Sequence, residues 1–325
     1  MSNLISRKND IHMNNNPYIS IIVPCYNEEQ VINETYKQLT EQIKTIGKPY
    51  EIIFINDGSK DATIEIVKNI AAMDKNVKII DFSRNFGHQC AVSAGLNYCT
   101  GEIAAIIDAD LQDPPAVILE MVKIMETEHA NVVYGVRKHR SGESWFKLKT
   151  AKWFYRTLNA MSEVKFPLDT GDFRILDRKV IDSFNALKEK NKYIRGLISW
   201  MGYKQLPCYY DREKRFAGET KYPLRKMLKF AMTGLFYFSK KPLQLATSLG
   251  MICIGLGLLY FLWLLIAVIS SLIITVPGWL SIIGIIIFFG GVQLLTIGVL
   301  GRYIGNIFDE TKNRPEFIVN EIINF

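Results

Sequence analysis

The sequence predicts an α/β domain with a mainly parallel sheet, followed by a hairpin of two transmembrane helices. Two observations carry this prediction. From residue 19 to residue 107, short runs rich in isoleucine and valine alternate with stretches of helical spacing, which is the pattern of a parallel sheet covered by helices. Between Lys241 and Arg302 the sequence has no Asp, Glu, Lys, Arg or His, and an uncharged stretch of this length is typical of membrane helices.

The chain begins with a polar stretch, residues 1–16, which lacks the apolar segment of a secretory signal and is expected to be a flexible tail. The α/β domain is expected over 17–221. Its strands are predicted at 19–23, 52–55, 77–81 and 103–107, and its helices at 28–45, 61–74 and 87–99. Because parallel sheets bind ligands beyond the carboxyl ends of their strands, the residues after each strand are the first candidates for function.

The uncharged block, 242–301, contains a turn signal, Val-Pro-Gly-Trp, that divides it into helices at about 243–273 and 279–301. Lys and Arg flank the block on both sides, so both flanks should face the cytoplasm. We therefore expect a multi-pass protein of the cytoplasmic membrane, with the α/β domain and both termini cytoplasmic. Residues 222–241 mix basic side chains with Leu, Met and Phe, which predicts an amphipathic juxtamembrane segment, with an ordinary surface helix as the alternative. Residues 302–325 are expected to be a cytoplasmic tail.

The composition of the chain limits the classes of partner that we expect it to bind. The net charge of +7 comes from Lys and Arg concentrated beside the uncharged block, as anionic lipid headgroups favour, so membrane lipids and no nucleic acid are expected. The five cysteines have no CxxC or His spacing, which indicates a reducing cytosol without a zinc site or disulfide framework. Glycines in the uncharged block would allow close helix packing and a homo-oligomer.

Polar motifs follow three of the predicted strands. Asp108, Asp110 and Asp113 lie within six residues after a buried strand, and such crowding is costly without a cation. Mg²⁺ or Mn²⁺ prefers carboxylate oxygens and leaves positions open for phosphate oxygens, whereas a solvated turn is the alternative. Pro-Cys-Tyr-Asn-Glu follows the first strand at 24–28, and Asn-Asp-Gly-Ser follows the second at 56–59.

With these motifs the chain resembles the family 2 inverting glycosyltransferases, which share the GT-A fold. It is most similar to the polyisoprenyl-phosphate glycosyltransferases, a group that includes bactoprenol glucosyltransferases and dolichol-phosphate mannosyltransferases. The similarity lies in Ser-Arg-Asn-Phe-Gly-His-Gln at 83–89, Asp-Ala-Asp-Leu-Gln-Asp-Pro-Pro at 108–115, Thr-Gly-Asp-Phe-Arg at 170–174 and Gly-Glu-Thr-Lys-Tyr at 218–222. It runs from about residue 18 to about residue 314, and bactoprenol glucosyltransferase-like members carry the same two-helix carboxyl terminus. The resemblance implies transfer of one hexose, with inversion, from a nucleotide-sugar to a polyprenyl phosphate.

Carried over position by position, the resemblance implies a site for the nucleotide-sugar and a metal. The residues expected at the nucleotide-sugar are Pro24, Tyr26, Glu28, Ile55, Asp57, Asp108, Ala109 and Lys221. Asp110 and Gln112 are expected to hold the Mg²⁺ or Mn²⁺ ion. Relatives often have two acids before Gly-Ser, whereas this chain has Asn56 and Asp57, so the comparison depends on Asp57 and Asn56 could be a turn residue.

Two residues are expected to act on the reacting groups. Arg215 would stabilise the negative charge of the departing nucleoside diphosphate, with a solvated basic loop as the alternative. Asp172 would be the general base on the acceptor side. A phosphate acceptor has a second pKa of ~6 and is already largely ionised at neutral pH, so the alternative is that Asp172 holds Arg174 or orients the acceptor.

Arg137 and Lys149 are expected to bind the acceptor phosphate, because a lipid phosphate requires cations near the membrane side of the site. Residues 145–158 interleave Lys and Arg with aromatic side chains, as a helix at the headgroup boundary would, although a solvent-facing helix has the same pattern. For His88 a role at a helix start or in the core is expected rather than catalysis.

UDP-glucose is the expected donor because the overall resemblance is to bactoprenol glucosyltransferases, with UDP-N-acetylglucosamine and GDP-mannose as alternatives. The product would be a lipid-linked sugar for cell-envelope glycan modification. A non-catalytic membrane scaffold would explain the hydropathy but not carboxylates at successive strand ends. A processive polysaccharide synthase is a further alternative, and such enzymes resemble one another in a Gln-x-x-Arg-Trp motif. This chain lacks the motif and has only Arg195 and Trp200 in the sequence Arg-Gly-Leu-Ile-Ser-Trp.

Overall fold

The computed structural model describes residues 17–137, 170–190, 192–211, 241–270 and 279–325. These residues form two compact units. The first comprises the described residues up to 211 together with 314–325, and the second comprises the described residues from 241 to 313. The predicted flexible tail, the aromatic and basic stretch at 145–158 and residues 222–240 of the juxtamembrane segment lie outside the described residues.

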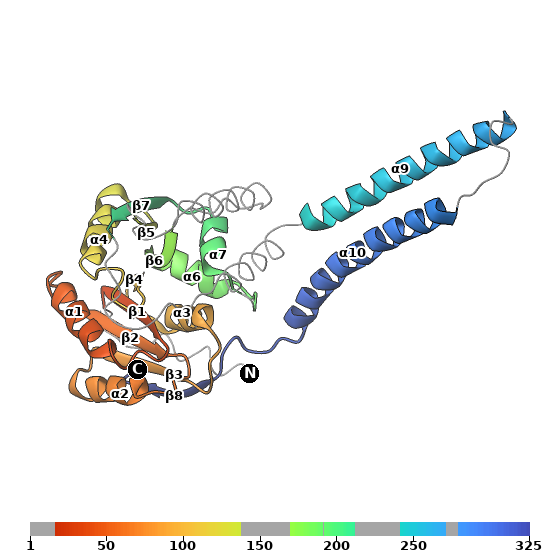
Figure 1. Ribbon diagram of the computed structural model, residues 1–325. Helices are drawn as coiled ribbons and strands as arrows, with labels where there is room; N and C mark the ends of the chain where they lie inside the picture. Colours follow the sequence, from red (N-terminus) through yellow and green to blue (C-terminus); the bar gives the residue numbers. More distant parts are fainter. Residues whose placement is uncertain (1–16, 138–169, 191, 212–240, 271–278) are drawn as a thin grey trace, which may run out of the picture. The chain divides into compact units, whose positions relative to one another are not determined.

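Within the described residues, the first unit contains an eight-stranded sheet in the order β7-β5-β6-β4-β1-β2-β3-β8 (Figure 1). The strands are β1 Ile19–Cys25, β2 Tyr50–Asn56, β3 Val77–Phe82, β4 Ile103–Ile106, β5 Val132–Arg137, β6 Thr170–Asp177, β7 Gln205–Tyr210 and β8 Val319–Ile323. β1 pairs in parallel with β2 and β4, and β2 pairs in parallel with β3. β6 is antiparallel to β4 and β5, while β7 is parallel to β5. The predicted mainly parallel sheet is therefore confirmed.

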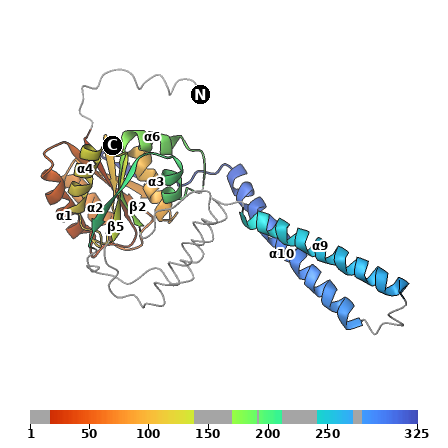
Figure 2. The same cartoon turned by 90° about the horizontal axis from the view of Figure 1, so that it is seen from above.

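Helices cover both faces of this sheet. They are α1 Ile32–Lys44, α2 Thr63–Met73, α3 His88–Tyr98, α4 Val117–Glu128, α6 Arg178–Ala186 and α7 Ile194–Trp200. α1, α2 and α4 lie on one face, and α3 and α6 lie on the other (Figure 2). The adjacent β1 residues Ile21 and Ile22 are both fully buried, because a strand between two helical layers must be apolar on both sides. Gly95 brings α3 close to β1, since a Cβ there would lie 2.3 Å from Cγ2 of Ile22.

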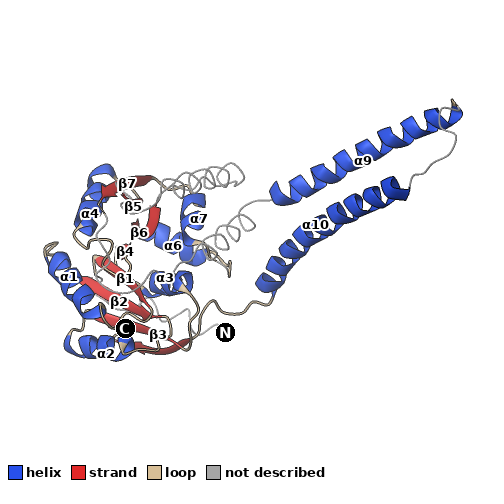
Figure 3. Cartoon of the chain, in the orientation of Figure 1, coloured by secondary structure: helices blue, strands red, loops and turns tan. Residues whose placement is uncertain are grey.

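The second unit consists of two long helices, α9 Lys241–Ile269 and α10 Trp279–Thr311, drawn in blue in Figure 3. Among the described residues, one stretch, Phe288–Thr311, is long and apolar enough to cross a membrane, and Ala246–Gly257 is a shorter apolar stretch. The two-helix transmembrane hairpin therefore stays a prediction. Large apolar side chains on both helices are more than half exposed, among them Leu256, Leu259, Trp263, Phe288, Leu294 and Leu295.

The residues expected as a tail after 302 have regular structure. α10 continues to Thr311, and β8 then adds an antiparallel edge strand beside β3, with Ile322 opposite Ile80. The Phe317 ring stacks on Phe82 with ring centroids 5.0 Å apart. Residues 314–325 thus belong to the α/β unit rather than to the helical unit.

Candidate active site

Strand direction brings the candidate residues to one edge of the sheet. The parallel strands β1, β2 and β4 all end at this edge, and so do β5 and β7. β6 is antiparallel to β4 and therefore begins there. Asp108 after β4, Arg137 at the end of β5, Asp172 at the start of β6 and Tyr210 at the end of β7 consequently share one edge. β1 has β2 on one side and β4 on the other, which is the switch point where α/β sheets bind ligands.

The loops after β1 and β2 are tied together by hydrogen bonds. The Asn27 amide N–H donates to Oγ of Ser59 at 3.0 Å, and Oδ1 of Asn27 accepts from the backbone of Lys60 at 2.8 Å. The Glu28 amide donates to Oγ1 of Thr63 at 2.8 Å. Asn27 has a φ of 54°, a left-handed conformation that asparagine adopts more readily than most residues. Hydrogen bonds thus hold the motif at 24–28 against the loop that contains the motif at 56–59.

Asp57 holds the turn that leads into α3. Its carboxylate is 4% exposed and accepts from Nδ2 of Asn85 at 2.9 Å, from the Phe86 amide at 2.7 Å and from the Gly87 amide at 3.0 Å. Desolvation raises the pKa of Asp57 in spite of these backbone hydrogen bonds. Gly58 is required here, because its φ is +66° and a Cβ would lie 2.5 Å from the backbone nitrogen of Asn85. A nucleotide contact by Asp57 stays a prediction.

Other residues predicted at the nucleotide-sugar have little free side-chain surface. Ile55 is fully buried, and Ala109 is 3% exposed with its carbonyl accepting from Oγ1 of Thr35 at 2.7 Å. These two residues can offer backbone atoms to a ligand rather than side chains. Asn56 is more than a turn residue, since Nδ2 of its side chain donates to Oδ1 of Asp81 at 2.7 Å and so links β2 to β3. At the end of β1, Pro24 is buried, and on the loop that follows Tyr26 and Glu28 are half-buried.

The loop after β4 combines a partly exposed carboxylate with a strained backbone. The Asp108 side chain is 39% exposed. Leu111 has a φ of 56°, and a bulky side chain in this left-handed region is a rare conformation of the kind found at functional sites. The Gln112 amide closes the turn by donating to Oδ1 of Asp110 at 3.2 Å. The three predicted residues Asp108, Asp110 and Gln112 therefore share one short, strained loop.

Asp172 lies at the centre of a charged cluster. Oδ1 of Asp172 accepts from Nε of Arg195 at 2.6 Å, and Oδ2 accepts from Nη2 of Arg195 at 3.1 Å, which is a bidentate pair. Nε2 of His88 lies 3.3 Å from Oδ2 of Asp172 and 3.6 Å from Oδ1 of Asp108. Nε2 of Gln89 also donates to Oδ2 of Asp172 at 3.3 Å. The cluster joins the starts of α3, α7 and β6.

These contacts set the protonation of the cluster. Desolvation acts on Asp172, but the Arg195 guanidinium and His88 outweigh it and hold the pKa of Asp172 well below its usual range. Desolvation lowers the pKa of His88, yet the carboxylates of Asp108 and Asp172 raise it to about 9, so the imidazole is protonated at neutral pH. Desolvation and nearby carboxylates raise the pKa of Asp108 to about 6 against the attraction of His88.

Two of these contacts differ from those expected from the sequence. Arg174 was one expected partner of Asp172, but its guanidinium donates to the backbone carbonyls of Gly171 at 3.0 Å and Asp172 at 3.3 Å, and the Asp172 carboxylate is held by Arg195. His88 is the first residue of α3, as a helix-start role requires, and its side chain also belongs to the cluster. Arg195 lies 23 residues beyond Asp172, a separation that gives no local pattern to recognise.

Arg137, predicted at the acceptor phosphate, lies beside the start of β6. Its Nη2 is 3.7 Å from Oδ1 of Asp113, and its Nε donates to the Tyr210 hydroxyl at 3.4 Å. The Tyr210 hydroxyl in turn donates to Oδ1 of Asp113 at 2.5 Å. A Cβ on Gly171, the neighbour of Asp172, would lie 3.0 Å from Nη2 of Arg137. The other predicted cations, Lys149, Arg215 and Lys221, lie outside the described residues.

The loop after β4 carries the candidate metal ligands. Among the described residues, no group of three or more His, Cys, Asp or Glu is arranged to hold a metal ion by itself. Asp110 and Gln112 offer a carboxylate and an amide oxygen, which suit Mg²⁺ or Mn²⁺ and leave its other positions to phosphate oxygens. Nearby carboxylates contribute to the raised pKa of Asp108, so a cation at this edge would be favoured. The residues present fit a divalent cation shared with a diphosphate.

Known proteins are similar to this chain over most of its length. The family described as "Glycosyl transferase family 2" matches residues 20–184. An uncharacterized glycosyltransferase of Bacillus subtilis, YkcC, is 52% identical over 303 residues, covering 93% of each chain. A prophage bactoprenol glucosyl transferase homolog of Escherichia coli is 38% identical over 94% of this chain and 99% of that protein. The bactoprenol glucosyl transferase of Shigella phage SfII is 40% identical over 93% of this chain and 97% of that protein.

Solved structures align more loosely. A mannosyltransferase of Pyrobaculum calidifontis in complex with GDP-Man and Mn²⁺ has 18% identity and a TM-score of 0.44, covering 89% of this chain and 87% of that chain.

Proposed function

This chain belongs to glycosyl transferase family 2, with a GT-A α/β fold, and we propose that it transfers glucose from UDP-glucose to a polyprenyl phosphate such as undecaprenyl phosphate. One observation carries the proposal. Relatives named bactoprenol glucosyl transferase are 38–40% identical to it over 93–94% of the chain. The reaction would invert the anomeric centre and give a lipid-linked sugar for cell-envelope glycan modification.

The Asp172 cluster supports an acceptor that is already ionised. A carboxylate whose pKa is held well below its usual range is a weak proton acceptor, because general bases act best with a pKa near the working pH. A phosphate monoester with a second pKa of ~6 needs no base at neutral pH. We therefore favour the predicted alternative in which Asp172 orients the acceptor over its predicted role as a general base.

Arg137 is our proposed contact for the acceptor phosphate. Its guanidinium has five N–H donors in a planar fork, so the pair with Asp113 leaves donors that can point elsewhere. The position beside Gly171 puts it next to Asp172, at the side of the site opposite the β1 and β2 loops. Lys149 is proposed as a second contact, and Arg215 and Lys221 as cations near the leaving diphosphate.

Asp110 and Gln112 would hold Mg²⁺ or Mn²⁺ together with the donor diphosphate. When bound, such an ion stabilises the negative charge that develops on the departing nucleoside diphosphate. The left-handed turn at Leu111 fixes the backbone between these two residues, so their spacing is set before any ligand arrives. The Asn27 and Asp57 loops complete the proposed donor side.

We further propose that α9 and α10 form a transmembrane hairpin in the cytoplasmic membrane, with the α/β unit on the cytoplasmic side. The absence of Asp, Glu, Lys, Arg and His from residues 242–301 supports this, as do the exposed apolar side chains of both helices. An acceptor carried by a lipid requires the enzyme to work at a membrane surface, so anchoring and substrate agree.

The test is sugar transfer by the purified full chain in detergent, given undecaprenyl phosphate with Mg²⁺ or Mn²⁺. Radiolabelled UDP-glucose, UDP-N-acetylglucosamine and GDP-mannose are supplied in parallel. Labelled lipid from UDP-glucose is the expected result. Labelled lipid from another donor alone would overturn the choice of sugar, and hydrolysis of a donor without labelled lipid would overturn the acceptor.

A further inference from the structure

Residues 314–325 reach the elements that hold the Asp172 cluster. Glu316 has a side chain that is only 14% exposed and contacts two separate elements. Its Oε2 accepts from Oγ of Ser93, in the middle of α3, at 2.7 Å. Its Oε1 lies 3.0 Å from Nζ of Lys192, just before α7. A single carboxylate therefore joins α3 to the segment that leads into α7.

Those two elements also meet at Asp172. α3 begins with His88 and Gln89, and α7 begins with Ile194 and Arg195. Oε1 of Gln89 accepts from the Ile194 amide at 3.1 Å, while its Nε2 donates to Asp172. A shift of either helix start would therefore change how His88, Gln89 and Arg195 contact the Asp172 carboxylate.

The Glu316 contact is energetically significant because it accompanies a buried charge. The Lys192 side chain is 5% exposed, with its ammonium 4.9 Å from the centre of the Phe184 ring. A buried ammonium requires a counter-charge, and among the described residues Glu316 forms an ion pair with it. Without that carboxylate the buried ammonium would lose its ion-pair partner, which would favour a shift of Lys192 and with it of the start of α7.

We infer that Glu316 is a positioning residue for sugar transfer, acting through Lys192 and Ser93 on the groups that hold Asp172. The inference rests on the proposed function for the role of Asp172, and on the described contacts for everything else. It gives residues 314–325 a part in the reaction, although they follow the long helices in the sequence and lie outside the family match at 20–184.

The test compares Glu316→Gln with Glu321→Gln in the purified full chain. Glu321 lies in the same segment but pairs with Lys68 at the surface, where its side chain is 45% exposed. Glu316→Gln keeps the size of the side chain and removes the charge. We expect kcat to fall by about tenfold to a hundredfold with the KM for the donor changed less than about twofold, since small misplacements of reacting groups affect the rate first. Glu321→Gln should stay within about twofold of wild type in both constants.

Two further variants separate positioning from folding. Glu316→Asp keeps the charge and should give a kcat between those of wild type and Glu316→Gln. If Glu316→Gln fails to fold, the double variant Lys192→Met with Glu316→Gln removes the buried ammonium as well, and its folded protein should show the same loss of kcat. Normal kcat in Glu316→Gln, or in the folded double variant, would overturn the inference.

The rates are measured with whichever donor and acceptor the wild-type chain uses. Failure of the glucose or lipid assignment then appears in wild type and leaves the ratio of variant to wild type interpretable. An equal loss of kcat in Glu316→Gln and Glu321→Gln would also overturn the inference, because it would indicate a general effect of the segment.

Discussion

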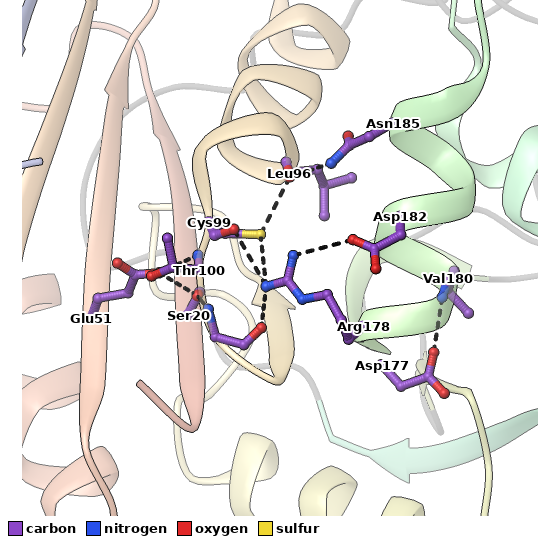
Figure 4. Close-up of polar contacts among 11 residues, drawn as sticks. Ser20, Glu51, Leu96, Cys99, Thr100, Asp177, Arg178, Val180, Asp182 and Asn185 are labelled. Carbon is purple, nitrogen blue, oxygen red and sulfur yellow. Dashed lines mark hydrogen bonds and ion pairs between the residues drawn. The ribbon is translucent and has the colours of Figure 1, made fainter. Parts of the chain in front are cut away.

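The beginnings and the ends of the parallel strands differ in how their acidic side chains are paired. At the edge where the parallel strands begin, Glu51 is 2% exposed and accepts from Oγ of Ser20 at 2.5 Å and from the Thr100 amide at 2.7 Å (Figure 4). It also lies 2.6 Å from Nζ of Lys78. Although desolvation acts against it, these partners lower the pKa of Glu51. At the opposite edge the pKa of Asp108 rises to about 6.

The difference shows which acidic side chains are paired with groups of the chain itself. Glu51 has a lysine, a hydroxyl and an amide from its own chain, so its charge stabilises the fold. Asp108 shares one imidazolium with Asp172 and lies among further carboxylates, an environment that a bound cation would stabilise. We interpret an acid paired with cations and donors of its own chain as structural, and an acid crowded with other carboxylates as a candidate for function.

α3 connects the two edges. At its end, Arg178 of α6 donates to the carbonyl of Cys99 at 3.3 Å and also to that of Gly101, and Nδ2 of Asn185 donates to the Leu96 carbonyl at 2.9 Å (Figure 4). Carbonyls near the end of a helix lack partners within it, so α6 supplies them. The far end of α3 is thus fixed, and its start can present His88 to the carboxylates.

The comparison predicts the largest effect for Asp110→Ala. This change should lower sugar transfer by about a thousandfold or more, because a metal-bound diphosphate would lose its carboxylate ligand. The melting temperature and the membrane association of the protein should remain those of wild type. Transfer is measured with radiolabelled donor and undecaprenyl phosphate. Normal activity would contradict the functional interpretation of this edge.

Glu51→Gln tests the opposite edge. Removing one partner of a buried ion pair should destabilise the fold by about 3 kcal/mol, which corresponds to a fall in melting temperature of roughly 6–12 °C. Activity per folded molecule should be unchanged. The control is Glu126→Gln, whose pair with Lys48 is about half exposed and should matter by less than about 1 kcal/mol. Equal melting temperatures for the two variants would contradict the structural interpretation of Glu51.

Arg137→Ala should separate acceptor from donor. We expect the KM for the lipid to rise by about tenfold while the KM for the nucleotide-sugar changes little, since one charge-assisted contact is worth about 1.5 kcal/mol. Tyr210→Phe is the matched control, because it also removes a partner of Asp113 but leaves the guanidinium in place. Equal changes in both KM values would argue against the placement of the acceptor.

A further expected effect concerns the pH dependence of stability. His88 has a pKa of about 9 in the folded protein against an ordinary value of 6.5, so its protonated form stabilises the fold fully below pH 6.5. This contribution should decline as the pH rises through about 9. The difference in melting temperature between wild type and His88→Gln should therefore be largest near pH 6 and shrink above pH 9. A difference that does not vary with pH would contradict the ion pairs assigned to His88.

Some of this could be read from the sequence. The strands β1 to β4 were predictable because strands buried on both faces are continuous runs of Ile, Val and Ala, and the motifs after them mark the ligand edge. The contacts of Arg195 with Asp172, and of Glu316 with Ser93 and Lys192, could not be found in this way, since long-range contacts leave no local spacing. β8 was missed because five residues of mixed polarity after a long apolar block give no strand signal.

The placement of β8 also orders events during synthesis. Because β8 follows α9 and α10 in the sequence, a ribosome makes both long helices before it makes the strand that covers the β3 edge. Translation adds about 5–20 residues per second, so in the nascent α/β unit the side of β3 that will face β8 has no strand partner for several seconds. A molecule acquires its complete sheet, and with it the Glu316 contacts, only after both long helices have been made.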